Sequence, residues 1–253
     1  MIKFFRKIRY DLMAKNKTGK YFKYAIGEIV LVVIGILIAL QINNWNEHRL
    51  QKIEENNILI SIKEDFENAI KEFRELNNNR EAIAKTSLKL YSIIRNKDTN
   101  YNKVEIDSLL SNLIINPTYN SQTKTIDVLF SSGKISIISN GSIKNSLLSW
   151  PQKIEDMVEG EIYGSDVLVN KLYPLMSKYV SIFDINRKLN FKSYEIFDTT
   201  LKSAYVSDYE GLFEDREFEN LLSERELFIQ VGIIETSELI DQAESIIKLI
   251  TND

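Results

Sequence analysis

Apolar residues are distributed unevenly along this chain. Residues 25–42 form one nearly continuous apolar run, in which only Glu28 and Gln41 are strongly polar. After residue 54, apolar residues recur every three or four positions, which is typical of amphipathic helices. The pattern therefore predicts one uniformly apolar helix near the N-terminus, followed by a long region of amphipathic helices.

The apolar run has the length of a membrane span. Tyr24 and Trp45 flank it and are 21 residues apart, which corresponds to about 31 Å of helix at roughly 1.5 Å per residue. The hydrocarbon core of a bilayer is about 30 Å thick, and aromatic rings favour its two interfaces. We therefore expect residues 24–45 to be a transmembrane helix anchored by Tyr24 and Trp45. The alternative is a buried helix of a soluble domain, which the flanking aromatic residues and the absence of charge over residues 29–41 disfavour.

Charge on the two sides of the run predicts its orientation. Residues 1–23 carry eight lysines and arginines against one aspartate, whereas residues 43–253 carry 24 basic and 34 acidic residues. Because basic flanks stay on the cytoplasmic side, the N-terminus is expected inside the cell and residues 46–253 outside it, in the periplasm of a cell with two membranes. Residues 1–23 are either an amphipathic helix on anionic lipid or a solvated basic tail. A cleaved signal peptide and a pilin leader both fit the run less well than an uncleaved anchor.

Three residues within the run are candidates for contact with a partner helix. Glu28 is the one charged residue between Tyr24 and Trp45, and it is either a tolerated charge near the interface or a polar contact to another helix. Gly35 and Ala39 form a small-xxx-small pair, which allows two membrane helices to approach closely.

The outer region is expected to be an all-α bundle with two long helices and several short ones. The long helices are predicted over residues 54–94, with an interruption near 77–79, and over residues 213–250. Shorter helices are predicted from Asp107 to Pro117 and over residues 121–130, 143–160 and 162–179, and Pro151 is expected to bend or restart its helix. Residues 96–100 and 184–192 read as loops, and residues 135–138 as a strand or a helical turn. The predicted division is 1–23 cytoplasmic segment, 24–45 transmembrane helix and 46–253 extracytoplasmic domain.

Composition supports a folded helical chain. Hydrophobic residues make up 44% of the sequence, with only three prolines and nine glycines, which favours long helices over turn-rich β structure. The absence of cysteine excludes disulfides and thiolate sites. The acidic outer region argues against nucleic acid as a partner, because nucleic-acid binding needs a basic surface.

The sequence shows little catalytic chemistry. Its single histidine, His48, follows the interfacial tryptophan closely and is expected to be solvated, and no glycine-rich phosphate loop is present. Six acidic residues between 208 and 219 read as helix N-terminal charges, with a weak cation site as the alternative. We therefore predict no catalytic residue, no metal and no cofactor, and we expect that the protein is not an enzyme.

One inter-helix segment is a candidate ligand loop. Residues 131–140 join two predicted helices and contain turn-forming and N-capping residues. Ser132, Lys134 and Asn140 serve either in capping and turn formation or in binding an anion near a helix N-terminus.

Two stretches of the chain resemble a known family. The N-terminal AIGEIVLVVIGILIALQINNWNE and the internal LFSSGKISIISNGSIKNSL are similar to motifs of an uncharacterised family of single-pass membrane proteins of Bacteroidota. The resemblance implies a membrane anchor and a mostly helical outer domain, and it supplies no activity.

Three functions are compatible with these features. The preferred one is a membrane-anchored, non-enzymatic interaction or sensing protein, in contact with the lipid bilayer and with a protein partner or a second copy of itself. With a cytoplasmic segment of about 23 residues, signalling would require a separate partner. The alternatives are an accessory subunit of a larger membrane complex and an envelope hydrolase that uses two carboxylates.

Overall fold

The computed structural model is built from helices joined by short connections. It describes Arg6, Tyr10 and residues 18–96, 101–120, 123–189, 198 and 200–252. No residue in these ranges is in a β-strand, so the predicted all-α fold is confirmed. The predicted segment 1–23 and the predicted loop at 96–100 fall mostly outside the described residues.

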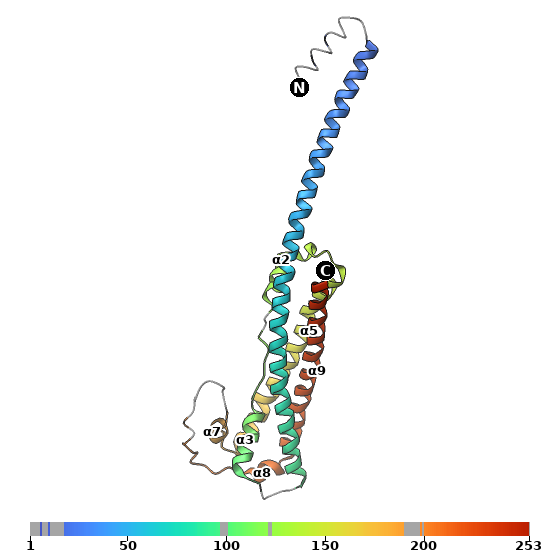
Figure 1. Cartoon of the computed structure of the whole chain (residues 1–253). Helices are drawn as coiled ribbons and strands as arrows, with labels where there is room; N and C mark the ends of the chain where they lie inside the picture. The colour runs from blue at the N-terminus through green and yellow to red at the C-terminus, as the bar shows by residue number, and fades with distance from the viewer. Residues whose placement is uncertain are drawn as a thin grey trace. The chain divides into compact units, whose positions relative to one another are not determined.

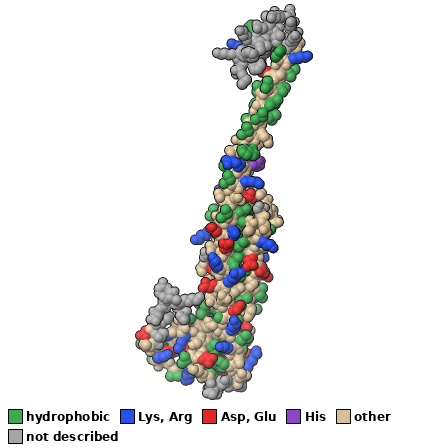
Figure 2. Space-filling view, viewed as in Figure 1, with side chains coloured by type: hydrophobic (Ala, Val, Ile, Leu, Met, Phe, Trp, Pro, Cys, Tyr) green, Lys and Arg blue, Asp and Glu red, His purple; other side chains and the backbone are tan. Residues whose placement is uncertain are grey.

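The chain divides into two compact units, Met1–Asn57 and Ile58–Asp253. Helix α2, Thr18–Asn96, contributes residues to both. In the first unit, the described part of α2 exposes its apolar side chains, including Leu31 at 63% and Leu37 at 59%. Figure 2 shows hydrophobic side chains covering this part of the helix. By length and composition, α2 is the one helix among the described residues that is suited to cross a membrane, and none of its most apolar 18-residue window is buried.

Helix α2 continues without a break through the polar residues at 77–79, so the predicted interruption there is wrong. The helix persists because Asn77 is anchored to α9, while Asn78 and Asn79 face solvent on the exposed side of the helix. The Asn77 amide donates to Ser237 Oγ at 3.3 Å and lies 3.5 Å from the Ile233 carbonyl oxygen.

Three long helices form the second unit: the C-terminal part of α2, α5 (Gly141–Asp166) and α9 (Arg216–Asn252). Contacts from Arg74 to Glu244 and from Arg80 to Gly232 show that α2 and α9 run antiparallel. Helix α5 also runs antiparallel to α9, because Gln242 contacts Ser146 whereas Arg225 contacts Gly164. Helices α2 and α5 are therefore parallel to each other, and Figure 1 shows the three helices side by side.

The parallel arrangement of α2 and α5 requires a connection that returns along the bundle. After α3 (Lys103–Leu113), residues 114–120 and Thr123 run back toward the start of the bundle and lead into α4 (Lys124–Ser131). Carboxylates of α2 hold this connection by its backbone: Asn120 N–H donates to Glu72 Oε1 at 2.7 Å, and Thr125 N–H donates to Asp65 Oδ2 at 2.6 Å.

Helix boundaries in this region differ in detail from the predicted ones. Helix α3 begins four residues before Asp107, because the Asn102 side chain caps its first turn by accepting from Val104 N–H. Helix α4 begins at Lys124 and not at residue 121, with Thr123 at the N-cap position but without a side-chain cap hydrogen bond. Residues 135–138, predicted as a strand or a turn, belong mainly to the short 3₁₀ helix η1, Lys134–Ile137.

Helix α5 passes through Pro151 without ending, although proline in a helix interior costs about 3 kcal/mol. The predicted restart there is wrong because neighbouring residues anchor the helix: Leu147 and Trp150 are buried in the core. The other alternative, a bend at Pro151, stays a prediction. Helix α5 continues into a π-helical stretch, η2 (Val167–Leu172), and then α6 (Tyr173–Tyr179). Tyr173 N–H donates to the Leu168 carbonyl just before Pro174, where the proline ring requires a departure from regular α geometry.

The remaining elements are two short helices, α7 (Ile182–Asn186) and α8 (Tyr209–Glu214). Helix α7 occupies the start of the predicted loop at 184–192, so that prediction is partly wrong. Ser181 starts the helix by accepting a hydrogen bond from Asp184 N–H at 3.2 Å, and Ile185 is fully buried. The final helix, α9, matches the predicted helix over residues 213–250 closely.

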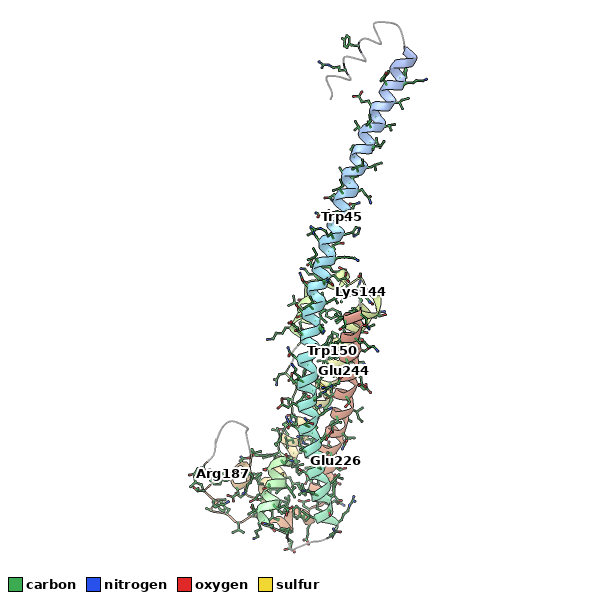
Figure 3. All side chains as sticks on the ribbon, viewed as in Figure 1. Trp45, Lys144, Trp150, Arg187, Glu226 and Glu244 are labelled. Carbon is green, nitrogen blue, oxygen red and sulfur yellow. The ribbon has the colours of Figure 1, made fainter. Side chains whose placement is uncertain are left out.

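The second unit has two separate hydrophobic cores. The first, which we call the Trp150 core, involves residues 59–76 of α2, 143–157 of α5 and 239–246 of α9. It contains Trp150, which is labelled in Figure 3. The Phe66 ring packs edge-on against Trp150, with 4.7 Å between the ring centroids. The second, the α3 core, involves residues 83–90 of α2, α3, η2, α6, α7, α8 and residues 218–229 of α9. Between the two cores in sequence are residues 77–82 of α2, 158–166 of α5 and 230–238 of α9.

Candidate functional site

Buried polar side chains from the three long helices form a cluster next to the α3 core. Arg80, Glu161 and Thr236 lie between the two cores in sequence, whereas Arg225 lies within the stretch of α9 that belongs to the α3 core. Arg80 of α2, Glu161 of α5, and Arg225 and Thr236 of α9 form this cluster, which we call the polar layer. Arg80 and Arg225 are each 2% exposed and Thr236 is fully buried. Charged residues are almost never this buried unless they are paired, so the polar layer is the strongest candidate site among the described residues.

Arg80 is the centre of the polar layer. Its Nη2 donates to Glu161 Oε1 at 2.5 Å, its Nη1 donates to the Gly232 carbonyl at 2.8 Å, and Nη1 also donates to Thr236 Oγ1. One guanidinium group therefore joins α2 to both α5 and α9. Burial lowers the pKa of Arg80, and the neighbouring Glu161 carboxylate opposes this change.

Glu161 has both carboxylate oxygens engaged. Oε1 accepts from Arg80, and Oε2 accepts from Tyr119 N–H of the returning connection at 3.0 Å. Burial raises the pKa of Glu161, while the Tyr119 N–H and the Arg80 charge act in the opposite direction. The ion pair is inaccessible, because the side chains of Arg80 and Glu161 are 3% and 9% exposed.

Two helical glycines make room for side chains: Gly232 for Arg80, and Gly164 for Phe228 beside Arg225. A Cβ at Gly232 would lie 3.1 Å from Arg80 Cζ, and a Cβ at Gly164 would lie 3.1 Å from Phe228 Cβ and 3.7 Å from Arg225 Nη1. Glycine inside a helix costs about 1 kcal/mol relative to alanine. At these two positions the cost is explained by the space that the buried side chains need.

Arg225 is held by neutral acceptors. Its Nη2 donates to the Ile115 carbonyl at 2.6 Å, and its Nη1 donates to the Gly164 carbonyl at 3.2 Å and Asn116 Oδ1 at 3.4 Å. Burial, together with the nearby positive charge of Arg80, lowers the pKa of Arg225 to about 10. The guanidinium therefore remains protonated at neutral pH.

A small cavity of about 20 Å³ lies beside the two arginines. Its lining includes Arg80, Arg225 and Glu161, with Gly160 and Gly164 among the residues that complete its wall. A water molecule needs about 10–15 Å³ of such space, so the cavity has room for one water-sized species.

Side chains of the predicted ligand loop form hydrogen bonds with backbone groups of the adjacent helix ends. Ser132 Oγ donates to the Val128 carbonyl at 2.7 Å, and Asn140 Oδ1 accepts from Ser142 N–H and Ile143 N–H at the start of α5. Gly133 between them has φ = 71°, a left-handed conformation that favours glycine. These contacts agree with capping and turn formation, and ligand binding by Ser132, Lys134 and Asn140 stays a prediction.

The other predicted residues lie on the exposed part of α2. Tyr24 and Trp45 are 53% and 65% exposed, and a Cβ at Gly35 would have no heavy atom within 4 Å. Glu28, Gly35 and Ala39 are seven and four residues apart, which places them on one face of the helix. None of these residues is near the polar layer in sequence.

The weak cation site that was the alternative for residues 208–219 finds no support among the described residues. His48 is exposed on α2. Asp208 accepts from Gly211 N–H at 2.9 Å, and Asp215 accepts from Glu217 N–H at 2.8 Å, so both act as helix N-terminal caps. No group of three or more histidine, aspartate or glutamate residues in the described ranges could hold a metal ion.

Sequence reasoning missed the polar layer. Arg80 lies in the polar gap that was interpreted as a helix interruption, and Glu161 and Arg225 occur among many other charges on amphipathic helices. The available signal was the combination of that gap with the helical glycines at 160, 164 and 232.

A family model matches residues 28–223, and its description is "Family of unknown function (DUF6090)". The match covers more than half of the chain. The chain belongs to this family. The DUF6090 match includes Arg80 and Glu161 and ends inside α9, before Arg225 and Thr236. Comparison with the curated proteins gives no match, and comparison with the solved structures gives none.

We expect Glu161→Gln to destabilise the bundle by about 3 kcal/mol, because it leaves the Arg80 charge buried without its partner. The free energy of unfolding can be followed through the fluorescence of buried Trp150 in full-length protein carrying Trp45→Phe, since the chain has only these two tryptophans.

Glu244→Gln is the matched control, because it removes the same charge from a pair with Arg74 in which the side chains are 62% and 51% exposed. That change should cost less than about 1 kcal/mol. Equal losses in the two variants would contradict the special role of Glu161.

Proposed function

We propose that this chain is a membrane-anchored, non-enzymatic interaction or sensing protein of the cell envelope. Residues 24–45 of α2 form the transmembrane anchor, and residues 46–253 form an extracytoplasmic domain. The partners are the lipid bilayer and a protein, either another membrane component or a second copy of the chain. Nucleic acid is not among them.

The observation that carries this proposal is the full exposure of the apolar run. An 18-residue window of α2 has a mean hydropathy of 2.6, and none of it is buried by other parts of the protein. A helix in the core of a soluble protein would be covered by neighbouring elements. Burying this surface in lipid removes the cost of its contact with water, and Tyr24 and Trp45 are spaced to lie at the two interfaces.

Charge asymmetry supports the orientation. Eight of the nine charged residues before Tyr24 are basic, and basic residues beside a span favour the cytoplasmic side. The proposal therefore places the N-terminus in the cytoplasm, the helix in the inner membrane and the bundle in the periplasm. The proposal also assigns the chain to Bacteroidota, because the segment GEIVLVVIGILIALQINNWNE resembles a motif of proteins from that group.

A non-enzymatic role is supported by the pairing of the buried Glu161 carboxylate and by the small size of the cavity next to it. The Glu161 carboxylate is fully engaged with Arg80 and a backbone N–H, and the adjoining cavity of about 20 Å³ is too small for a hydrolase substrate. A two-carboxylate hydrolase needs paired acids that face a cleft. Two other acids lie near this pair: the charge of Glu72 raises the pKa of Glu161, and burial raises the pKa of Glu235 while Arg80 opposes that change.

The second candidate is an accessory subunit of a membrane complex, with contacts through α2. It is favoured by the alignment of Glu28, Gly35 and Ala39 on one exposed face, since small residues allow close helix contact in lipid. This face also suits contact between two copies of the chain.

Topology can be tested by cysteine labelling, because the natural chain contains no cysteine. Lys153, exposed on α5, and Lys3, before the span, are each replaced by cysteine in separate variants. In intact spheroplasts, a membrane-impermeant maleimide should label Lys153→Cys and leave Lys3→Cys unlabelled until the membrane is permeabilised.

The two variants control for each other, since permeabilised cells should show equal labelling of both. Labelling of Lys3→Cys in intact spheroplasts, or release of the full-length protein from membranes by alkaline carbonate, would contradict the proposal.

Helix association can be tested with Gly35→Leu in full-length protein. The larger side chain should reduce chemical cross-linking in native membranes several-fold, because it separates the two backbones. Val33→Leu, on the opposite face of α2, is the matched control and should leave cross-linking unchanged. Unchanged association in Gly35→Leu would remove this face as a contact.

A further inference from the structure

Arg225 differs from Arg80 in lacking a counter-charge. Arg80 is paired with Glu161, whereas all three hydrogen-bond acceptors of Arg225 are neutral: two backbone carbonyls and the Asn116 side chain. Within the described ranges no carboxylate is paired with Arg225, and its Nε has no hydrogen-bond partner although it is buried.

This arrangement is costly without a further partner. A buried charge that lacks an opposite charge costs several kcal/mol, even after relaxation of its surroundings. The nearby Arg80 increases the cost, because it is positive and contributes to the lowered pKa of Arg225. Carbonyl dipoles and the Asn116 amide satisfy part of the guanidinium but supply no net negative charge.

The two carboxylates that approach the layer do not neutralise Arg225. Glu161 directs its oxygens to Arg80 Nη2 and Tyr119 N–H. Glu235 interacts electrostatically with Arg80, and its Oε2 lies 3.4 Å from where a Cβ at Gly160 would be. The buried Glu235 Oε2 also has no hydrogen-bond partner, but Glu235 interacts electrostatically with Arg80 and not with Arg225. Among the described residues, Arg225 is therefore the arginine of the polar layer that has no carboxylate partner.

The cavity beside Arg225 has the size of a single small ion. Its volume is about 20 Å³, and its wall combines Arg80, Arg225, Glu161 and Asn116 with glycine backbone and the apolar side chains of Pro117, Phe228 and Ile229. Two arginines against one carboxylate give the wall a net positive charge. Phosphate, sulfate and carboxylate ligands have several heavy atoms and exceed this volume.

We propose that this cavity binds one monovalent anion, chloride under physiological conditions, through the Arg225 guanidinium. The anion supplies the missing counter-charge and accepts a hydrogen bond from Arg225 Nε. Because it binds the folded bundle and not the unfolded chain, it stabilises the polar layer and couples the bundle to the halide concentration around it. The inference stands on the second unit alone and does not depend on membrane anchoring.

Thermal unfolding of the full-length protein in a non-ionic detergent tests the site. Trp150 fluorescence in the Trp45→Phe background reports the bundle, while chloride replaces gluconate at constant ionic strength. We expect the melting temperature to rise by about 3 °C as chloride reaches tenfold its dissociation constant. Bromide should act similarly and sulfate should not. Equal melting temperatures in chloride and gluconate would overturn the proposal.

Variants assign the effect to the cavity. Arg225→Met removes the charge with little change in length and should abolish the chloride-dependent shift, while Arg74→Met, at an exposed arginine, should retain it. If Arg225→Met does not fold, Gly160→Ala decides, because its methyl group narrows the cavity without contacting either arginine. A full chloride shift in Arg225→Met or in Gly160→Ala would overturn the assignment.

Crystals soaked in bromide give a direct test. The proposal requires an anomalous peak within hydrogen-bond distance of Arg225 Nε. A water molecule at that position, with bromide only on the protein surface, would contradict it.

Discussion

The bundle depends on one buried ion pair. Arg80 donates to Glu161 of α5 and to two groups of α9, so a single guanidinium fixes the positions of three helices. A displacement of one helical turn, about 5.4 Å, would separate Arg80 from Glu161 and leave both charges buried and unpaired. Apolar packing alone tolerates such displacements more readily, because one leucine or isoleucine can replace another in a core. We infer that the polar layer sets the register of α2, α5 and α9.

Other features of the second unit follow from this layer. Gly232 allows Arg80 to lie against the backbone of α9, and Gly164 leaves room for Phe228 against α5. The returning connection between α3 and α4 supplies Tyr119 N–H to Glu161 and the Ile115 carbonyl to Arg225, so a segment without regular structure completes the layer. The two hydrophobic cores on either side then pack independently, one around Trp150 and the other around α3.

The sequence predicted those features that depend on local composition. The exposed apolar run of α2 follows from eighteen consecutive positions, and the Asn140 cap of α5 follows from a single residue and the two amides after it. The two long helices of the second unit were also predicted, because apolar residues recur at helical spacing over residues 54–94 and 213–250.

The polar layer was not predictable in the same way. Hydrophobic periodicity assigns charged residues to the solvent face of a helix. Arg225 was therefore interpreted as a surface residue, and Arg80 as part of a polar interruption of its helix. Their burial depends on partners that are distant in sequence: Glu161 is 81 residues from Arg80, and Thr236 is 156 residues away. The continuity of α2 through residues 77–79, and of α5 through Pro151, also results from tertiary contacts that outweigh local propensity.

The central claim is that Arg80 and Glu161 act as one unit, and a double-mutant cycle of unfolding free energies tests it most directly. The variants are Arg80→Met, Glu161→Leu and the combination of the two, each in full-length protein. We predict that each single change costs about 3 kcal/mol or more, and that the double variant loses less than the sum by about 3 kcal/mol, because it leaves no unpaired charge. Losses that add to within about 0.5 kcal/mol would contradict the account.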